Sequence, residues 1–489
     1  MGTMDEGRKA ARLVFPGHKF GADDPEEALA LVRLGVGGFC LYGGRAAEAA
    51  EFTARLQAAS PSPLLFCGDY EDGLATQCPG GTALPSNMGL GAAGSETLAR
   101  RKGELTALES RAVGVDWVFA PVLDLATQPA NPIVNIRSFS SEPREVARLA
   151  RAYVRGLKAA GALSCLKHFP GHGETRADSH LELPEVSAPR ELLELRELAP
   201  FRELAKEADS VMTGHLLVPA LEPDPGLPYS LSADVRRTLR ERWGFTGLVS
   251  TDALNMKAVA DRFEELDAAR RALLGGSDIL LVPRDPRRLI RELSAAVEES
   301  PELKASVEIS CERLQKALRG GGGRPAFELV GCRAHGQEAG RMAEACLAWA
   351  RGAIPPPGRR LLYWEAEAGS PQERLGAAFI QALRERGFTV IAYAGQEPSP
   401  GETLVLGSFL SPRAYSGRIA YSPRQAERIR AALSRSKSSF VVSFGSPFVF
   451  EALSAGGLCA FSRSEAAQKA AARALAGEIE VKGRLPVAQ

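Results

Sequence analysis

Short apolar runs alternate with amphipathic or charged segments along the first part of the chain. Eight such runs can be distinguished, at residues 13–15, 37–42, 64–67, 117–122, 162–166, 210–213, 247–250 and 278–282. Short apolar strands separated by helical segments indicate an α/β fold with a parallel sheet and crossover helices. Eight of them over this length predict a TIM (β/α)8 barrel, which typically takes about 250 residues. A doubly wound open sheet is the alternative that the pattern leaves open.

The pattern changes after a long helical stretch at residues 286–318. A glycine-rich segment at 319–325 and a proline-rich segment at 354–358 then flank one predicted helix at 336–351. Beyond them a second alternation of strands and helices is expected at 361–364, 372–386, 389–393, 403–409, 423–434, 440–444 and 465–475. We therefore expect a barrel domain, a linker with one helix and a smaller α/β layered (sandwich) domain, at residues 1–318, 319–358 and 359–489. The last domain has no dense histidine or carboxylate cluster, which favours a structural or substrate-capping role.

Composition excludes several classes of protein. A hydrophobic content of 45% and a charged content of 24% are typical of a soluble globular protein. The net charge of +1 gives no driving force toward nucleic acid or an anionic membrane, so neither is an expected partner. No apolar run approaches the roughly 20 residues that span a bilayer. Because residues 1–10 are polar and lack the apolar region of a secretory signal, we expect a cytoplasmic protein, and we expect it to be a monomer.

The eight cysteines do not resemble a disulfide framework, since the chain is long and they are widely spread. Cys40, Cys67 and Cys165 lie in apolar runs, where reduced cysteines are common. No Cys-x-x-Cys pair is present, which argues against a thiolate metal site or a redox motif.

Polar residues follow the C-terminal ends of these apolar runs. They are Asp69 and Glu71 after the third run, Asp124 after the fourth, Lys167 and His168 after the fifth, His215 after the sixth and Asp252 after the seventh. In a barrel this end carries the active site, because the loops there converge over one axis. Mixed donors and acceptors of the kind that sugar hydroxyls need are supplied by Lys167, Arg137, Asp69 and Asp124. Surface ion pairs would explain any one of these residues but not their shared position.

Residues 167–180 are the most informative segment, with three of the six histidines, a lysine and two carboxylates. Pro170, Gly171 and Gly173 prevent a continuous helix, so we expect a loop that brings His168 and His180 into one cleft. Loops on a rigid scaffold are where catalytic residues are commonly found.

Two histidines of the same segment have the spacing of a metal site. His168 and His172 have the i, i+4 spacing of zinc proteases, but Pro170 and Gly171 disrupt the helix that would aim both at one ion. The adjacent Lys167 would repel a cation. We therefore expect no metal and no cofactor.

Two residues have the chemistry of a catalytic pair. Asp252 follows a buried strand directly and suits an attacking carboxylate held at a fixed place, although Asp252 as the N-cap of a helix beginning at Ala253 is the alternative. Asp178 stands two positions before His180 and can orient it, raising its pKa toward that of a general acid at neutral pH. A structural loop histidine is the alternative there.

These residues together resemble the β-N-acetylglucosaminidases of glycoside hydrolase family 3. The resemblance is carried by residues 167–180 and 250–256, with further matches at 120–124, 131–140, 212–215 and 483–486. It extends over the predicted barrel and, more loosely, over the second domain. It implies hydrolysis of terminal β-linked N-acetylglucosamine with retention of configuration.

The resemblance also implies a role for each matching residue. Asp252 corresponds to the nucleophile, and His180 with Asp178 corresponds to the general acid/base. The remaining matches correspond to residues that bind the sugar, namely Asp69, Asp124, Arg137, Lys167, His168, His215 and Met256.

One motif departs from the family pattern. Relatives follow Asp-x-Glu with Gly-Gly-Arg and a second arginine three residues later, whereas this chain has Leu74 and Gln77 at those positions. If those arginines bind an anionic muropeptide aglycone, this protein prefers a different one. A β-glucosidase, a phosphorolytic enzyme of the same family and a non-catalytic sugar-binding relative are the functional alternatives.

Overall fold

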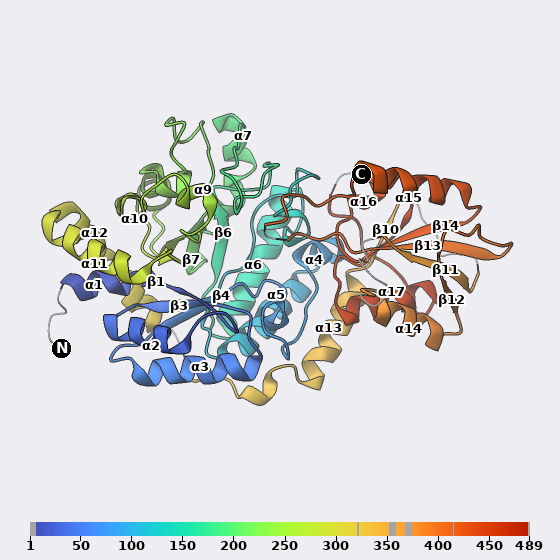
Figure 1. The fold of residues 1–489 in the computed structure, drawn as a ribbon, viewed down its shortest axis with the longest axis horizontal. Helices are drawn as coiled ribbons and strands as arrows, with labels where there is room; N and C mark the ends of the chain where they lie inside the picture. The colour runs from blue at the N-terminus through green and yellow to red at the C-terminus, as the bar shows by residue number, and fades with distance from the viewer. Residues whose placement is uncertain (1–5, 320–321, 352–357, 367–373, 414, 488–489) are drawn as a thin grey trace.

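The structure is a computed structural model that describes residues 6–319, 322–351, 358–366, 374–413 and 415–487. Figure 1 shows two parts side by side, an N-terminal part from blue to yellow and a C-terminal part from orange to red. Residues 320–321 and 352–357 of the predicted linker, and 372–373 of a predicted helix, lie outside the described residues. Within the described residues, no helix is both long and apolar enough to cross a membrane.

Short parallel strands form the inside of the N-terminal part. They are β1 (Val14–Phe15), β2 (Gly17–Lys19), β3 (Gly38–Tyr42), β4 (Leu65–Gly68), β5 (Trp117–Val118), β6 (Cys165–Phe169), β7 (Ser210–Thr213), β8 (Leu248–Thr251) and β9 (Leu280–Leu281). Each of the eight predicted runs contains or overlaps one strand, which confirms the parallel α/β class. Only β2, which follows β1 after Pro16, was not predicted.

The neighbours of each strand follow the order of the chain. One parallel sheet has the order β2-β3-β4-β5 and another has β6-β7-β8, while β1 pairs with β9. Single parallel bridges connect Trp117 with Leu163 and Ser250 with Ile279, between these sheets. This sequential order argues against the doubly wound alternative, in which the strand order reverses at a switch point.

Helices pack around these strands. They are α1 (Glu6–Arg12), α2 (Pro25–Leu34), α3 (Ala46–Ala59), α4 (Asn87–Ala93), α5 (Glu96–Ala112), α6 (Pro143–Ala159), α7 (Arg190–Leu195), α8 (Leu198–Leu204), α9 (Lys257–Ala260), α10 (Glu265–Leu274), α11 (Pro286–Glu299) and α12 (Pro301–Leu318). The predicted stretch 286–318 is thus two helices. Ser300 ends α11 and caps α12, accepting a hydrogen bond from the Leu303 N–H with Pro301 at the first helical position.

The C-terminal part is a layered α/β unit, as predicted. Its sheet has the order β10-β15-β14-β13-β11-β12, parallel except for the pair β10–β15. The strands are β10 (Ala348–Ala350), β11 (Arg360–Glu365), β12 (Thr389–Ala392), β13 (Glu402–Ser408), β14 (Ser439–Ser443) and β15 (Gly457–Cys459). The helices are α13 (Arg333–Ala345), α14 (Ala377–Glu385), α15 (Pro423–Arg435), α16 (Val449–Leu453) and α17 (Glu465–Leu475). Figure 1 shows α14 and α17 on one face of the sheet and α15 and α16 on the other.

The predicted helix at 336–351 is wrong over its last residues. Helix α13 ends at Ala345, and Ala348–Ala350 forms strand β10, antiparallel to β15. Ala348 and Ala350 are fully buried within this strand. The first strand of the C-terminal sheet therefore lies inside the predicted linker.

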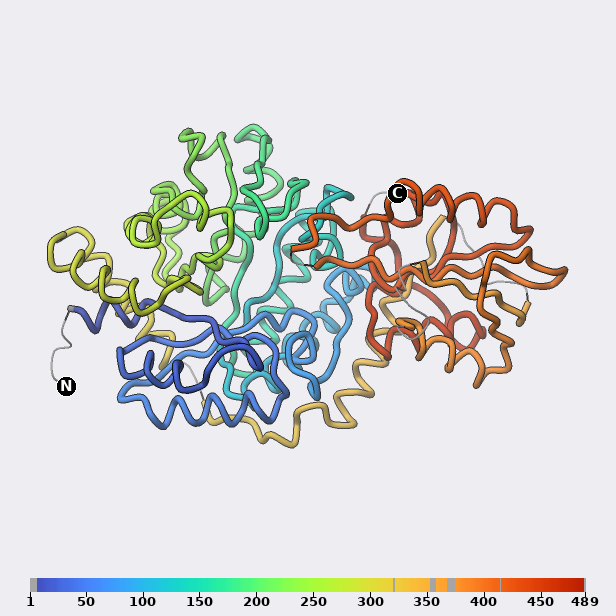
Figure 2. The backbone as a smooth tube through the Cα atoms, in the orientation of Figure 1, coloured from blue at the N-terminus to red at the C-terminus, as the bar shows by residue number. Residues whose placement is uncertain are grey.

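The two parts are held together by contacts between distant motifs. The Ser140 hydroxyl donates to the Pro486 carbonyl at 2.7 Å, and the Arg484 N–H donates to the Ala92 carbonyl at 3.0 Å. The segment after β13 also reaches from the C-terminal part toward the N-terminal part (Figure 2). These contacts bring the C-terminal part to the ends of the parallel strands.

Candidate active site

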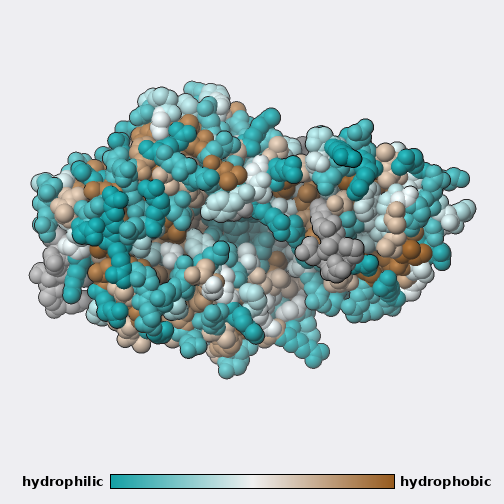
Figure 3. All heavy atoms as spheres, in the orientation of Figure 1, coloured by the Kyte–Doolittle hydropathy of each residue, from teal (hydrophilic) through white to brown (hydrophobic). Residues whose placement is uncertain are grey.

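A cavity of about 590 Å³ opens where the two parts meet, at the C-terminal ends of the N-terminal strands. The face shown in Figure 3 is mostly polar and is hollowed at this junction. Six of the ten predicted site residues line the cavity, namely Asp69, Arg137, Lys167, His168, His180 and Asp252. A second cavity of about 1000 Å³ adjoins it and shares Asp69, His180 and Asp252.

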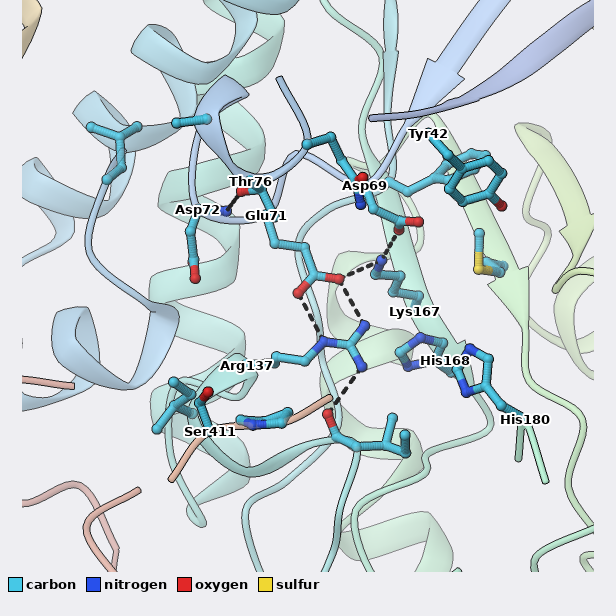
Figure 4. A pocket seen from close by; sticks show the side chains of 18 of the residues that line it. Tyr42, Asp69, Glu71, Asp72, Thr76, Arg137, Lys167, His168, His180 and Ser411 are labelled. Atoms are coloured by element: carbon cyan, nitrogen blue, oxygen red, sulfur yellow. Dashed lines mark hydrogen bonds and ion pairs between the residues drawn. The ribbon is translucent and has the colours of Figure 1, made fainter. Parts of the chain in front are cut away.

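A buried lysine lies at the centre of a charged cluster on the wall of the first cavity (Figure 4). The Lys167 side chain is 1% exposed, and its Nζ lies 2.6 Å from Asp69 Oδ1 and 2.5 Å from Glu71 Oε1. Arg137 donates two hydrogen bonds to Glu71, at 2.9 and 2.8 Å. Asp69 and Glu71 follow β4, Arg137 comes from the segment after β5, and Lys167 lies within β6.

Charge pairing keeps this cluster ionised. Burial alone would raise the pKa of Glu71, but Arg137 and Lys167 outweigh it and hold the pKa well below its usual range. Burial would lower the pKa of Lys167, but Asp69 and Glu71 raise it instead. Asp69 is one third exposed and faces the cavity. The cluster therefore offers fixed donors and acceptors for a polar ligand.

Asp124 lies behind His168 rather than on the cavity wall. Its carboxylate is 2.6 Å from His168 Nδ1 and accepts the backbone N–H groups of His168 and His172. Burial would raise the pKa of Asp124, but His168 lowers it overall. We predicted a direct sugar contact for Asp124. The structure instead makes it the residue that orients His168, a distinction that position after a strand does not reveal.

His172 holds the histidine loop together. Its Nδ1 lies 2.7 Å from Thr175 Oγ1 and its Nε2 lies 3.1 Å from Ser179 Oγ. Burial lowers its pKa to about 4, so it is neutral at physiological pH. Asn131 also anchors the loop by donating to the His172 carbonyl at 2.8 Å. His172 and Asn131 had not been predicted as site residues.

Asp178 and His180 form a hydrogen-bonded pair on this loop. His180 Nδ1 lies 2.8 Å from Asp178 Oδ1, which also accepts the His180 backbone N–H at 2.9 Å. Asp178 is buried; burial would raise its pKa, but the hydrogen bonds from His180 lower it overall. Because Nδ1 is engaged, Nε2 is the nitrogen that can exchange a proton with a ligand in the cavity.

Asp252 directly follows β8 and lines both cavities. Its backbone N–H donates to the Thr213 carbonyl at 2.9 Å, and its Oδ1 accepts the Ala253 N–H at 2.7 Å. Burial would raise its pKa, but His168, His215 and His180 outweigh burial and the pKa is lowered. The next helix, α9, begins at Lys257 and has Met256 at its N-cap position, so Asp252 is not a helix N-cap.

His215 and Met256 lie beside Asp252 in different ways. His215 is fully buried, with Nδ1 2.7 Å from Ser230 Oγ and Nε2 3.1 Å from the Ala253 carbonyl. Burial lowers its pKa. It therefore braces the strand end that carries Asp252 and does not line either cavity, contrary to the predicted sugar contact. Met256 lines the second cavity with Asp252.

The sequence favoured a structural or substrate-capping role for the C-terminal part but identified none of its residues as part of the site. Its residues line the first cavity at Ser411, Pro412, Phe461, Ser462, Arg463 and Ser464, and Tyr415 lines the second. The polar run after β15 was the available signal, but it lacks the carboxylates and histidines that mark the other loops.

The structure gives no support to a shared metal at His168 and His172. Their rings are 6.0 Å apart and perpendicular, and each is hydrogen-bonded to a different partner. In the part of the chain that the structure describes, no group of three or more His, Cys, Asp or Glu side chains is arranged around one ion site.

Comparison with known proteins identifies the class of this protein. Residues 8–317 match the family model described as "Glycosyl hydrolase family 3 N terminal domain". The chain belongs to glycosyl hydrolase family 3 and is a glycoside hydrolase, which confirms the resemblance found in the sequence.

Two of the similar proteins carry the name β-hexosaminidase. A β-hexosaminidase from Xylella fastidiosa (strain 9a5c) is 39% identical over 245 residues, which cover 48% of this chain and 72% of that protein. β-Hexosaminidase A from Pseudoalteromonas piscicida is 32% identical over 284 residues, 53% of this chain; the match spans 48% of that relative, about half its length.

Solved structures match nearly the whole chain. A family 3 β-N-acetylglucosaminidase from Paenibacillus sp. str. FPU-7 is 31% identical, with a TM-score of 0.85 and coverage of 99% of both chains. The β-glucoside phosphorylase BglX, bound to 2FGlc, has a TM-score of 0.90 at 23% identity, with coverage of 99% of this chain and 94% of that one. The second likeness, at this identity, concerns the fold alone.

Proposed function

We propose that this protein is a retaining exo-glycosidase that hydrolyses terminal β-linked N-acetylglucosamine. The observation that carries the proposal is that Asp252 and the Asp178–His180 pair border the same cavity, beside the ionised cluster around Lys167. The β-hexosaminidase relatives support N-acetylglucosamine as the sugar.

In the first step, Asp252 attacks the anomeric carbon and the bond to the leaving oxygen breaks. The imidazolium of His180 gives its Nε2 proton to that oxygen, and a covalent glycosyl ester forms on Asp252. In the second step, neutral His180 takes a proton from water, the water oxygen attacks the anomeric carbon, and Asp252 is released as carboxylate. Asp252, His180 and one water molecule account for every proton and electron pair in the two steps, so the mechanism as proposed uses no metal or cofactor.

The electrostatics of the site suit these roles. Asp252 is ionised at neutral pH because nearby histidines outweigh the effect of burial on its pKa. Asp178 is also ionised, so it can stabilise the imidazolium of His180. A histidine acid avoids placing a second exposed carboxylate next to the nucleophile.

The cluster around Lys167 is proposed to bind the sugar hydroxyls. Asp69 accepts hydrogen bonds, while Lys167 and Arg137 donate them from positions that Glu71 fixes on both sides. Such pre-positioned groups bind a hydroxylated ring without first losing side-chain freedom. His168, oriented by Asp124, adds a further group on the same wall.

We also propose that the N-terminal strands form the closed (β/α)8 barrel predicted from the sequence, over residues 1–318. Its support is the sequential strand order, together with the pairing of the first strand with the last. Residues 359–489 then form the second domain, to which β10 is added from the linker.

The direct test uses aryl β-N-acetylglucosaminides and the variants Asp252→Ala and His180→Ala. Asp252→Ala should lower kcat/KM by roughly 10⁴-fold or more on every substrate, because no nucleophile remains. His180→Ala should lower kcat/KM by about 10²-fold or more on a poor leaving group. On a 4-nitrophenyl leaving group the loss should be much smaller, since that group needs little protonation.

Other outcomes would support the alternatives. Equal losses across leaving groups would contradict His180 as the acid. Faster turnover of the aryl glucoside would indicate a β-glucosidase, and a sugar 1-phosphate product in phosphate buffer would indicate a phosphorylase. Sugar binding without any turnover would indicate a non-catalytic relative.

A further inference from the structure

An aromatic side chain from the C-terminal part lies against the proposed acid/base. The rings of Tyr415 and His180 are 4.8 Å apart between centroids and tilted by 58°. Both side chains line the second cavity together with Asp252. Tyr415 belongs to the segment after β13 that reaches across to the N-terminal part (Figure 2).

The backbone at Tyr415 has an uncommon conformation, and the side chain is largely exposed. Tyr415 has a φ of +64°, a left-handed conformation that non-glycine residues rarely adopt. The Ser416 hydroxyl braces the turn by donating to the carbonyls of Arg413, at 2.7 Å, and Arg418, at 3.2 Å. Tyr415 remains 61% exposed. A large aromatic residue that is this exposed does not contribute to a hydrophobic core. Its contact with His180 is therefore the interaction that can account for its position.

The same segment also touches the rest of the histidine loop. A Cβ on Gly417 would lie 3.3 Å from Leu181 Cδ1, so the Gly417 backbone packs closely against the Leu181 side chain. Burial would raise the pKa of Asp178, and the hydrogen bonds from His180 lower it. A hydrogen bond from the Gly417 N–H lowers the pKa of Asp178 further. The contact between the two loops therefore covers residues on both sides of His180.

His180 needs such a support because its own loop constrains it only partly. The loop between β6 and α7 has no helix or strand at His180, and the Asp178 hydrogen bond fixes only Nδ1. An imidazole held at one nitrogen can still tilt about that bond. The Tyr415 ring packed against the imidazole limits this tilt.

We propose that Tyr415 is a positioning residue that holds His180 so that Nε2 faces the leaving-group oxygen. This inference rests on the proposed function, because it assigns His180 as the acid. It gives the C-terminal part a role in proton transfer, beyond closing the cavity.

The test measures kcat/KM, which reports the first chemical step, on aryl β-N-acetylglucosaminides whose phenols differ in acidity but not in size. Tyr415→Ala should lose about twofold on the most acidic phenol and about tenfold on the least acidic. Tyr415→Phe, which keeps the ring, should stay within about twofold of the wild type throughout. The matched control is Phe327→Ala, an exposed aromatic that lines neither cavity, and it should change nothing.

A double-mutant cycle separates positioning from other roles. If Tyr415 acts through His180, adding Tyr415→Ala to His180→Ala should cause no further loss on the poor leaving group. An additive loss, an equal loss across all phenols, or a change in KM alone would overturn the proposal and make Tyr415 an aglycone contact. If the wild type turns over no aryl N-acetylglucosaminide, the proposed function itself fails, and the inference fails with it.

Discussion

At the scale of single residues, the site depends on charges that are buried in pairs. Lys167 is enclosed by Asp69 and Glu71, and Glu71 also accepts two hydrogen bonds from the Arg137 guanidinium. Removing one partner of a buried pair is costly because the remaining charge keeps its desolvation penalty without compensation. Glu71 therefore supports both the stability of the fold and the position of the sugar-binding cations.

Glu71→Gln should lower the free energy of unfolding by about 3 kcal/mol, since two buried cations lose their shared counter-charge. Urea unfolding at neutral pH measures this change. Asp267→Asn is the matched control, because it breaks an exposed pair with Arg271 and should cost less than about 1 kcal/mol. Equal costs for the two variants would mean that the Glu71 cluster is solvated and not a buried network.

Single residues also show what the sequence can predict. Asp252, Lys167 and His168 could be placed at the site because each stands at the end of an apolar run. Asp124 and His215 share that position but are buried behind other residues. Whether a side chain faces the cavity or supports a neighbour depends on packing between segments that are far apart in sequence, which a single strand does not encode.

At the scale of elements, the histidine loop is held by the neutral side chain of His172. Its pKa is lowered to about 4 by burial, against about 6.5 in an unfolded chain. Between these values the unfolded state binds the extra proton, so the stability that His172 contributes is complete above pH 6.5 and is lost as the pH falls toward 4. The full loss corresponds to about 3 kcal/mol.

His172→Asn should flatten the dependence of unfolding free energy on pH between 6.5 and 4. Urea unfolding at pH 7, 5.5 and 4.5 measures the slope for the variant and the wild type. Some slope should remain in the variant, because burial lowers the pKa of His215 and of His18 as well. Identical slopes would show that His172 is already protonated in the folded protein or is exposed to solvent.

The elements that the sequence missed are short and marginal. Strand β10 has only the residues Ala348–Ala350, and it follows α13 after a gap of two residues. Alanine favours a helix, so the pattern continued the helix through it. Its pairing with β15, about a hundred residues later, decides the outcome. Such long-range pairing is not visible in a local pattern.

At the scale of the whole molecule, the two parts share a hydrophobic cluster. Met88, Ala92 and Ile136 of the N-terminal part pack with residues of the C-terminal part, including Phe461 and Val487. The sequence predicted a barrel followed by a smaller layered α/β unit, and it treated the segment between them as a linker. The shared cluster instead couples the units beside the cavity that both of them line.

Met88→Ala tests this coupling, because Met88 is fully buried in the shared cluster and lines neither cavity. The lost side chain should cost about 2–5 kcal/mol. Because the cluster belongs to both parts, we expect calorimetry to show a single transition whose midpoint falls for the whole molecule. The tryptophans give a second readout, since Trp117 and Trp243 lie in one part and Trp349 and Trp364 in the other. When only one pair is kept at a time, with phenylalanine in place of the other two, the fluorescence midpoint of each variant should equal that variant's own calorimetric midpoint. Two separate transitions, with only one of them moved by Met88→Ala, would mean that the parts fold independently and that the cavity between them is set by docking alone.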